Sequence, residues 1–198
     1  MVAYAHSVSG APPARWELLS DHLAEVAELA ALFAAKFDAG EWGRASGLLH
    51  DVGKLSPEFQ ARLQGGKTPV DHSTAGARIA VDRFGGWGRL LAYAIAGHHA
   101  GLANWSGEIA FGDPTPLEQR LDARRPIPAT PGWESHCSLP EQLSPFTPTA
   151  RPELQGALAR QGLSLALFTR MLFSALVDAD RLATEAFYCK SGNRAHSR

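Results

Sequence analysis

The sequence predicts an all-α fold, in which a bundle of helices is interrupted by one proline-rich irregular insertion. Apolar residues recur at three- and four-residue spacing in several windows, which is the period of an amphipathic helix. Sustained alternation of apolar and polar residues, the pattern of a half-buried strand, is absent from the sequence. Nine of the thirteen prolines fall between Pro114 and Pro152, where they disrupt regular helix. The 198 residues suffice for one sizeable core, so we expect residues 1–198 to form a single domain.

The first half of the chain contains five predicted helices, over residues 16–38, 41–51, 56–65, 72–84 and 87–100. The first carries an apolar stripe along its whole length and ends at Gly40. The third begins with Ser56 as its cap and Pro57 at its first helical position. Because these helices are amphipathic, we expect them to pack around one shared core.

The second half is predicted to be irregular first and helical afterwards. Residues 103–151 form the insertion, with at most short ordered pieces, because proline at this density fits neither helix nor central strand. The helical pattern returns from Pro152 and is strongest over residues 163–188, where one face is apolar. The polar tail, residues 190–198, is expected to fray.

Composition narrows the class of protein. The net charge is −1, so any contact with nucleic acid must be local or must depend on metal ions. The two cysteines, Cys137 and Cys189, are far apart, which argues against a disulfide framework or a cysteine zinc site. A signal-peptide pattern and an uninterrupted apolar run of membrane-spanning length are both lacking. We therefore expect a cytoplasmic protein without a membrane partner.

The motif that carries chemistry is Leu48-Leu49-His50-Asp51-Val52-Gly53-Lys54. An adjacent imidazole and carboxylate at the end of a helix can grip one cation from neighbouring positions. Gly53 is expected to permit a sharp exit that leaves the pair at the mouth of the helix. Taken alone, His50-Asp51 is better explained as a polar pair at a helix end.

Other histidines and acidic residues lie at comparable places on neighbouring helices. They are His22 beside the first apolar stripe, His72 at a helix start, His98 and His99 at a helix end, and Asp178 and Asp180 in the last helix. Each has an ordinary structural explanation when considered singly. Carboxylates beside a core face, however, are costly unless they are paired or bind metal.

Taken together, these groups predict a metal site. Five imidazoles and at least two carboxylates would converge once the helices pack. This set of nitrogen and oxygen ligands favours Mn, Fe, Co or Ni, with Mg and Zn as alternatives. The number of ligands suggests two divalent ions, the arrangement that clamps a phosphodiester during hydrolysis.

These motifs resemble a known family. His22, the His50-Asp51 pair and a late helical Asp follow the signature of the HD phosphohydrolase superfamily. The blocks AHS, GLLHDVGKLSPEFQARL, VDHSTAGA, AGHHAGL and SALVDADRLATE more closely resemble the HD nuclease domain of the CRISPR-associated type I nuclease-helicase. The resemblance covers residues 4–105 and 165–187 and implies an HD-domain helical bundle.

The resemblance also implies roles for individual residues. The first metal ion would be held by His22, His50, Asp51 and Asp180. Asp51 would bridge to a second ion, completed by His72, His98 and His99. Lys54 would lie beside the scissile phosphate, whereas His6 receives no metal. The helical pattern does not choose between Asp178 and Asp180, and only the resemblance favours Asp180.

Three functions follow from these patterns. The first is endonucleolytic cleavage of single-stranded DNA in CRISPR type I interference, together with a helicase domain or subunit and the surveillance complex. In it the insertion would guide the strand through Trp105, Arg120, Arg124, Arg125 and Trp133. The second is hydrolysis of nucleotides or cyclic dinucleotides. The third is a non-catalytic adaptor. Since no helicase sequence follows in this chain, we expect either a stand-alone nuclease subunit or a domain of a longer protein.

Overall fold

The computed structural model describes residues 2–109, 111–146 and 158–191, and side chains of the last range from residue 162 onward. Its α-helices are α1 Leu19–Ala34, α2 Gly40–Leu49, α3 Pro57–Leu63, α4 Ser73–Gly97, α5 Leu117–Leu121 and α6 Leu158–Lys190. Short 3-10 turns are Pro13–Arg15, Ala35–Phe37, Val52–Leu55 and Trp133–Ser135, and two short strands are β1 Tyr4–His6 and β2 Glu17–Leu18. The predicted all-α class is confirmed. The predicted helical start at Pro152 and most of the tail lie outside the described residues.

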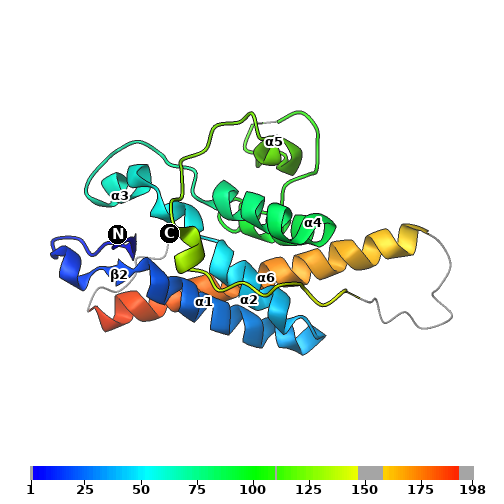
Figure 1. Ribbon diagram of the computed structural model, residues 1–198, viewed down its shortest axis with the longest axis horizontal. Coiled ribbons are helices and arrows are strands. Elements are labelled where there is room, and N and C mark those ends of the chain that lie inside the picture. Colours follow the sequence, from blue (N-terminus) through cyan, green and yellow to red (C-terminus); the bar gives the residue numbers. More distant parts are fainter. Residues whose placement is uncertain (1, 110, 147–157, 192–198) are drawn as a thin grey trace.

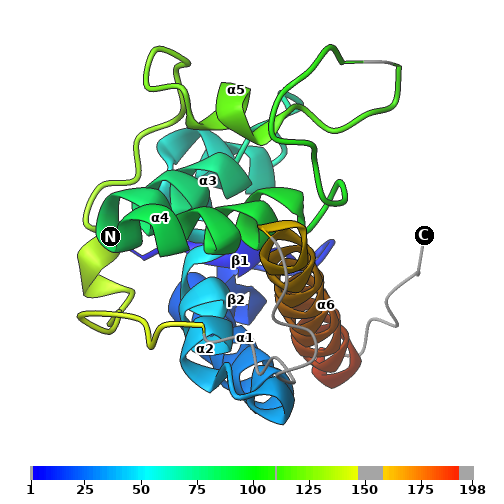
Figure 2. The same cartoon turned by 90° about the vertical axis from the view of Figure 1, so that its right-hand side faces the viewer.

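The core lies between four helices. α1 packs along α2 and α6, and α4 packs against α2 and α6. Figure 1 shows α6 running beside α1 and α2, and Figure 2, turned by 90°, shows α4 lying across them. The side chains that fill the core have no accessible surface and include Leu49, Leu91, Ile95, Leu172 and Leu176. The apolar faces read from the sequence therefore meet as expected.

Close approach of the backbones positions the end of α2. A Cβ atom added to Gly76 of α4 would lie 1.8 Å from the carbonyl oxygen of Leu49, and one added to Gly53 would lie 2.0 Å from that of His72. Gly53 was predicted to permit a sharp turn, but it does not have a positive φ. The glycine is needed instead because the start of α4 passes directly against it, which brings His72 beside the His50-Asp51 pair.

We expect Gly76→Ala to destabilise the protein by about 2 kcal/mol or more, because the added methyl group forces α4 away from α2. Gly86→Ala, on the same helix, is the matched control. Nothing lies within 4 Å of its added Cβ, so helix propensity should leave stability equal or slightly higher. Urea denaturation of both variants measures the difference. Equal midpoints for Gly76→Ala and the wild type would contradict this account of the interface.

One predicted boundary is wrong. The helix predicted from residue 16 begins at Leu19, because Glu17 and Leu18 form β2, which pairs antiparallel with β1. The helices predicted over 72–84 and 87–100 both lie within α4 and are separated by a kink at Gly85, whose φ of 58° and ψ of −127° are not helical. The break falls where the sequence predicted the first of these two helices to end, and the second ends at Gly97.

The predicted insertion is irregular, apart from α5 and the Trp133–Ser135 turn, in its described residues 103–109 and 111–146. It is nevertheless fastened to α4. Arg78 donates hydrogen bonds to the carbonyl oxygens of Arg120, Asp122 and Arg125 at 2.7–3.1 Å. The side chain of Arg120 in turn donates to Ser73 Oγ at 2.7 Å. The segment therefore covers α4 as a strap with defined contacts.

One helix among the described residues, α6, is long and apolar enough to cross a membrane by length and composition alone. One of its faces carries Phe168, Leu172 and Leu176, which are buried in the core against α1 and α4. Core helices pass the same test of length and composition. Packing in the bundle therefore accounts for this face of the helix, whereas Leu163, Leu167 and Leu182 on the same helix are exposed.

Candidate metal centre

The His50-Asp51 pair lies where α2 ends. His50 is the C-terminal cap, and its Nδ1 lies 2.7 Å from the carbonyl oxygen of Gly47, one turn back. This contact assigns the proton to Nδ1 and leaves Nε2 facing inward. Asp51 begins the Val52–Leu55 turn and is almost completely buried. An ionised carboxylate in such a place requires positive partners or a cation.

A first group of ligands contains His22, His50, Asp51 and Asp180. The Nε2 atom of His22 lies 3.5 Å from Asp51 Oδ2 and 3.4 Å from Asp180 Oδ1. The Nε2 atom of His50 lies 3.3 Å and 3.7 Å from the same two oxygens. These ligand atoms come from α1, α2 and α6 and lie within 4.8 Å of one another, so one divalent ion can contact them all.

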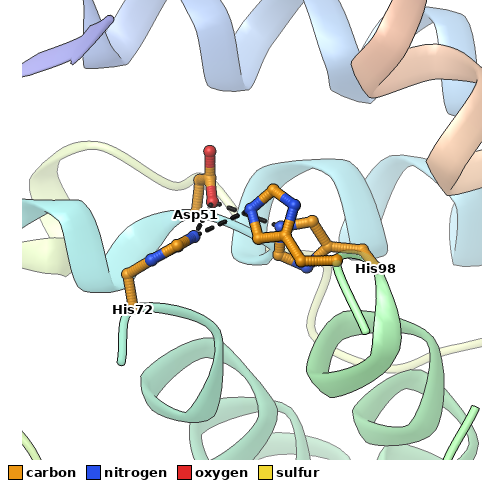
Figure 3. Close-up of side chains that lie close together, drawn as sticks. Asp51, His72 and His98 are labelled. Atoms are coloured by element: carbon orange, nitrogen blue, oxygen red, sulfur yellow. Dashed lines mark hydrogen bonds and ion pairs between the residues drawn. The ribbon is translucent and has the colours of Figure 1, made fainter. Parts of the chain in front are cut away.

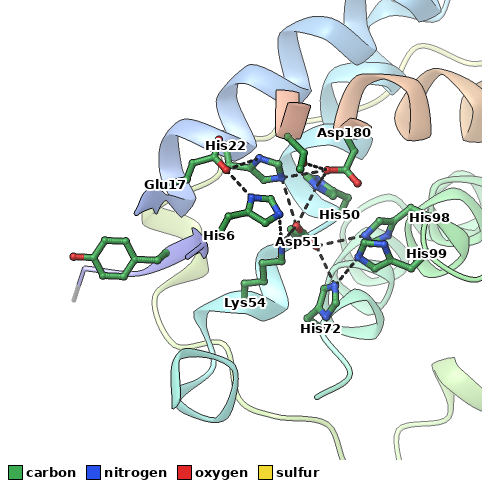
Figure 4. A network of polar contacts seen from close by, with 12 residues as sticks. His6, Glu17, His22, His50, Asp51, Lys54, His72, His98, His99 and Asp180 are labelled. Atoms are coloured by element: carbon green, nitrogen blue, oxygen red, sulfur yellow. Dashed lines mark hydrogen bonds and ion pairs between the residues drawn. The ribbon is translucent and has the colours of Figure 1, made fainter. Parts of the chain in front are cut away.

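A second group contains Asp51, His72, His98 and His99. The Nε2 atoms of His72 and His98 lie 3.3 Å and 3.4 Å from Asp51 Oδ1, as Figure 3 shows. The Nε2 atom of His99 lies 2.9 Å from that of His72. The two oxygens of Asp51 thus face different groups, Oδ2 the first and Oδ1 the second. Figure 4 shows this carboxylate at the centre of both.

The donor set fits two cations. The inward Nε2 atoms of His22, His50 and His98, and Asp51 Oδ1, are buried and have no hydrogen-bond partner among the described residues. Buried polar atoms are rarely left without a partner. The Nε2 atoms of His22 and His50 face the first group, and His98 Nε2 and Asp51 Oδ1 face the second. Nitrogen and oxygen atoms of this kind match the ligands of a divalent transition metal.

Charge differs between the two groups. Burial opposes protonation of His22 and His50, but the carboxylates of Asp51 and Asp180 outweigh it and raise their pKa values to about 10 and about 9. Burial lowers the pKa of His72 to about 4 and that of His99 to about 3. In the metal-free protein at neutral pH, His22 and His50 therefore hold protons that His72 and His99 lack.

We expect the first cation to displace about two protons at pH 7, from His22 and His50, because a metal binds only the neutral imidazole. His72 and His99 carry no proton that the second cation must displace. Raising the pH removes the competing protons, so affinity at the first group should increase until the pH passes the pKa values of about 9 and 10. In the metal-free protein, the protonated forms of His22 and His50 stabilise the fold. This contribution is complete below about pH 6.5 and is lost as the pH rises above about 9 to 10. Calorimetry in buffers of different ionisation enthalpy counts the protons. If the affinity of the first group for its cation does not change between pH 6 and 9, this assignment is contradicted.

The late carboxylate is Asp180. Asp178 is exposed and belongs to neither group, so of the two acidic residues that the sequence left open, Asp180 is the one that lies with the histidines. Lys54 lies 2.5 Å from Asp51 Oδ2 and is buried. Together with positive neighbours, it outweighs the effect of burial and holds the pKa of Asp51 well below its usual value. The seven predicted ligands are thus brought together with Lys54; their roles as ligands stay predictions.

Sequence reasoning missed Glu17 and gave no role to His6. Both lie against His22, and the three form a further compact group. Burial disfavours ionisation of Glu17, but the nearby imidazole of His22 and the hydrogen bond with His6 outweigh it and lower its pKa to about 2. The sequence prediction put Glu17 in the first helix and so gave no reason to single it out. Its side chain faces His22 because Glu17 belongs to β2, which pairs with β1.

Most of the side chains suggested as a guide for a nucleic-acid strand are engaged within the protein, and Arg120 and Arg125 both contact Asp71. Arg120 is engaged with Asp71 and Ser73 beneath the insertion. Arg124 is exposed and pairs with Asp122 at 2.8 Å. Trp133 is partly buried against the core, and Trp105 stacks with Arg89 at the opposite end of the insertion's sequence. The insertion therefore has a structural role in the strap over α4.

A helical bundle that gathers histidines and carboxylates in this way can hold divalent metal ions. The model of the HD domain matches residues 19–128, more than half of the chain, so the chain belongs to the HD domain family and to the class of metal-dependent phosphohydrolases. Comparison with curated proteins finds no match. The matched residues include every histidine of the two ligand groups and Asp51. Asp180, Glu17 and His6 lie outside them.

Proposed function

We propose that this protein is a metal-dependent endonuclease that cleaves single-stranded DNA in CRISPR type I interference, in the cytoplasm and together with a helicase domain or subunit. The observation that carries the proposal is the division of Asp51 between two ligand groups. Two adjacent divalent cations suit hydrolysis of a phosphodiester. The choice of DNA is supported by the resemblance of the HD, DHS and GHH blocks to the HD nuclease domain of type I systems.

The second ligand group is accessible from the surface, so a nucleic-acid strand can reach it. His99 is exposed and His72 is partly exposed, so the second ligand group opens at the surface, whereas His22 and His50 are closed in. A bound pair of divalent cations supplies a water of lowered pKa and neutralises charge on the phosphate. Lys54 lies beside Asp51, where its ammonium group can stabilise charge that develops on the phosphate oxygens.

A second candidate is hydrolysis of nucleotides or cyclic dinucleotides. It is favoured by an open pocket of about 440 Å³ that ends at Asp71, the neighbour of His72, and is also lined by Glu58, Arg62 and Thr68. These polar side chains can contact a base or a ribose. A small molecule held there would have its phosphate near the second ligand group.

One experiment separates the candidates. Protein loaded with Mn²⁺, Co²⁺ or Ni²⁺ is incubated with circular single-stranded DNA and, separately, with mononucleotides and cyclic dinucleotides. Linearisation of the circle is expected under the proposal, and His99→Ala should abolish it. His136→Ala, which removes a histidine outside both ligand groups, is the control. Hydrolysis of small molecules alone would support the second candidate, and no turnover with any metal would favour a non-catalytic adaptor.

A further inference from the structure

The two-stranded ribbon brings two polar residues to the edge of the metal centre. β1 and β2 pair antiparallel, and the register places His6 directly opposite Glu17. Neither residue lies in the part of the chain that matches the HD domain. Glu17 is buried although it is charged, so its position requires an explanation.

The contacts of these residues form a closed circuit that begins and ends at Asp51, as Figure 4 shows. Lys54 Nζ lies 2.5 Å from Asp51 Oδ2 and 3.5 Å from His6 Nε2. On the other side of the ring, His6 Nδ1 lies 2.6 Å from Glu17 Oε2. The same oxygen lies 3.4 Å from His22 Nδ1, and His22 Nε2 returns to Asp51 Oδ2 at 3.5 Å.

The circuit fixes where the protons are. An ammonium group only donates, so His6 Nε2 must accept from Lys54, and His6 Nδ1 must carry the proton that Glu17 accepts. The carboxylate of Glu17 likewise only accepts, so the proton of neutral His22 lies on Nδ1. The Nε2 lone pair of His22 is thereby left for a cation between Asp51 and Asp180.

His22 differs from the other inward histidines in this respect. The Nδ1 atoms of His50 and His98 lie 2.7 Å from backbone carbonyl oxygens of their own helices. Among the described residues, His22 Nδ1 has no hydrogen-bond partner in the backbone, and the carboxylate of Glu17 lies 3.4 Å away, at ion-pair distance. A carboxylate behind a metal-binding imidazole orients the ring and increases its basicity more than a carbonyl does.

We propose that Glu17 is a positioning residue that sets the affinity of the first cation through His22, and that His6 holds Glu17 in place. The proposal rests on the proposed function, because it assumes that the two ligand groups bind metal. The second group does not contact Glu17, so the effect is confined to one of the two ions. The ribbon thus supplies the outer support of the first group.

The test is Glu17→Gln, which keeps the size of the side chain and removes its charge. Calorimetric titration with Mn²⁺ should show one of the two dissociation constants raised by about 10- to 100-fold, with the other unchanged. Glu28→Gln, an exposed glutamate on α1, is the matched control and should leave both constants unchanged. Thermal melting of the metal-free variants checks that each is folded.

Two combinations identify the ion concerned. In His99→Ala protein, where the first group alone remains intact, Glu17→Gln should weaken the remaining ion. In Asp180→Asn protein, where the second group alone remains, it should have no further effect. His6→Gln should weaken the same ion to a smaller extent, because Glu17 keeps its charge but loses its support.

Three results are decisive. Unchanged constants in Glu17→Gln protein that still binds two ions would overturn this inference and leave the proposed function standing. Equal weakening of both ions, or a lower melting temperature with both constants unchanged, would overturn it too, by showing a merely structural role. A wild-type protein that binds no Mn²⁺ would instead overturn the proposed function.

Discussion

Asp51→Asn is expected to abolish binding of both cations and to reduce phosphodiester hydrolysis by about 10³-fold or more. Its two oxygens face the two ligand groups separately, at 3.3–3.5 Å from imidazole nitrogens on each side. An amide replaces one oxygen by a hydrogen-bond donor and removes the charge. Elemental analysis after dialysis against Mn²⁺, together with cleavage of circular single-stranded DNA, measures both effects.

The same substitution should destabilise the metal-free protein. Lys54 is buried and has Asp51 as its ion-pair partner at 2.5 Å. Removing one partner of a buried ion pair costs about 3–5 kcal/mol, so unfolding should occur at lower urea concentration. Wild-type cleavage with two bound ions in Asp51→Asn protein would show that the shared carboxylate is not the centre of the site.

Asp180→Asn is expected to reduce the number of bound cations from two to one and to lower hydrolysis by about 100-fold. Asp180 is a ligand of the first group alone, and its Oδ1 lies 3.4 Å from His22 Nε2 and 3.7 Å from His50 Nε2. Asp178→Asn is a closely matched control, because it changes the same residue type two positions earlier on the same helix, on an exposed face.

Asp178→Asn should retain both ions and the wild-type rate. Loss of an ion in that variant, with retention in Asp180→Asn, would mean that α6 turns a different face to the bundle in solution. The pair of variants therefore tests the orientation of this helix as well as the role of its carboxylate.

The helical class and the set of clustered residues could be predicted because both depend on side-chain chemistry and helical period. His50 and Asp51 end an apolar helix, and a buried carboxylate without a partner is improbable. The choice between Asp178 and Asp180 could not be made by period alone, since both flank the apolar stripe. Only the observed rotation of α6 against α1 places Asp180 toward His22.

Other features depend on contacts between distant segments. β2 has two residues, too few to show the alternation of a strand, so Glu17 was assigned to a helix. Position 53 requires glycine because a side chain there would collide with the carbonyl group of His72, which is nineteen positions away in the sequence. Arg120 likewise holds the insertion against α4 through hydrogen bonds to Asp71 and Ser73, which lie far from it in the sequence.

The position of Asp180 on the last described helix has a consequence for biosynthesis. Chains that end before α6 can already contain His22, His50, Asp51, His72, His98 and His99. Such chains lack the second carboxylate of the first group, and the hydrophobic surface that α6 covers is open. A nascent polypeptide therefore gathers all seven predicted ligands only after α6 has left the ribosome and docked on α1 and α4.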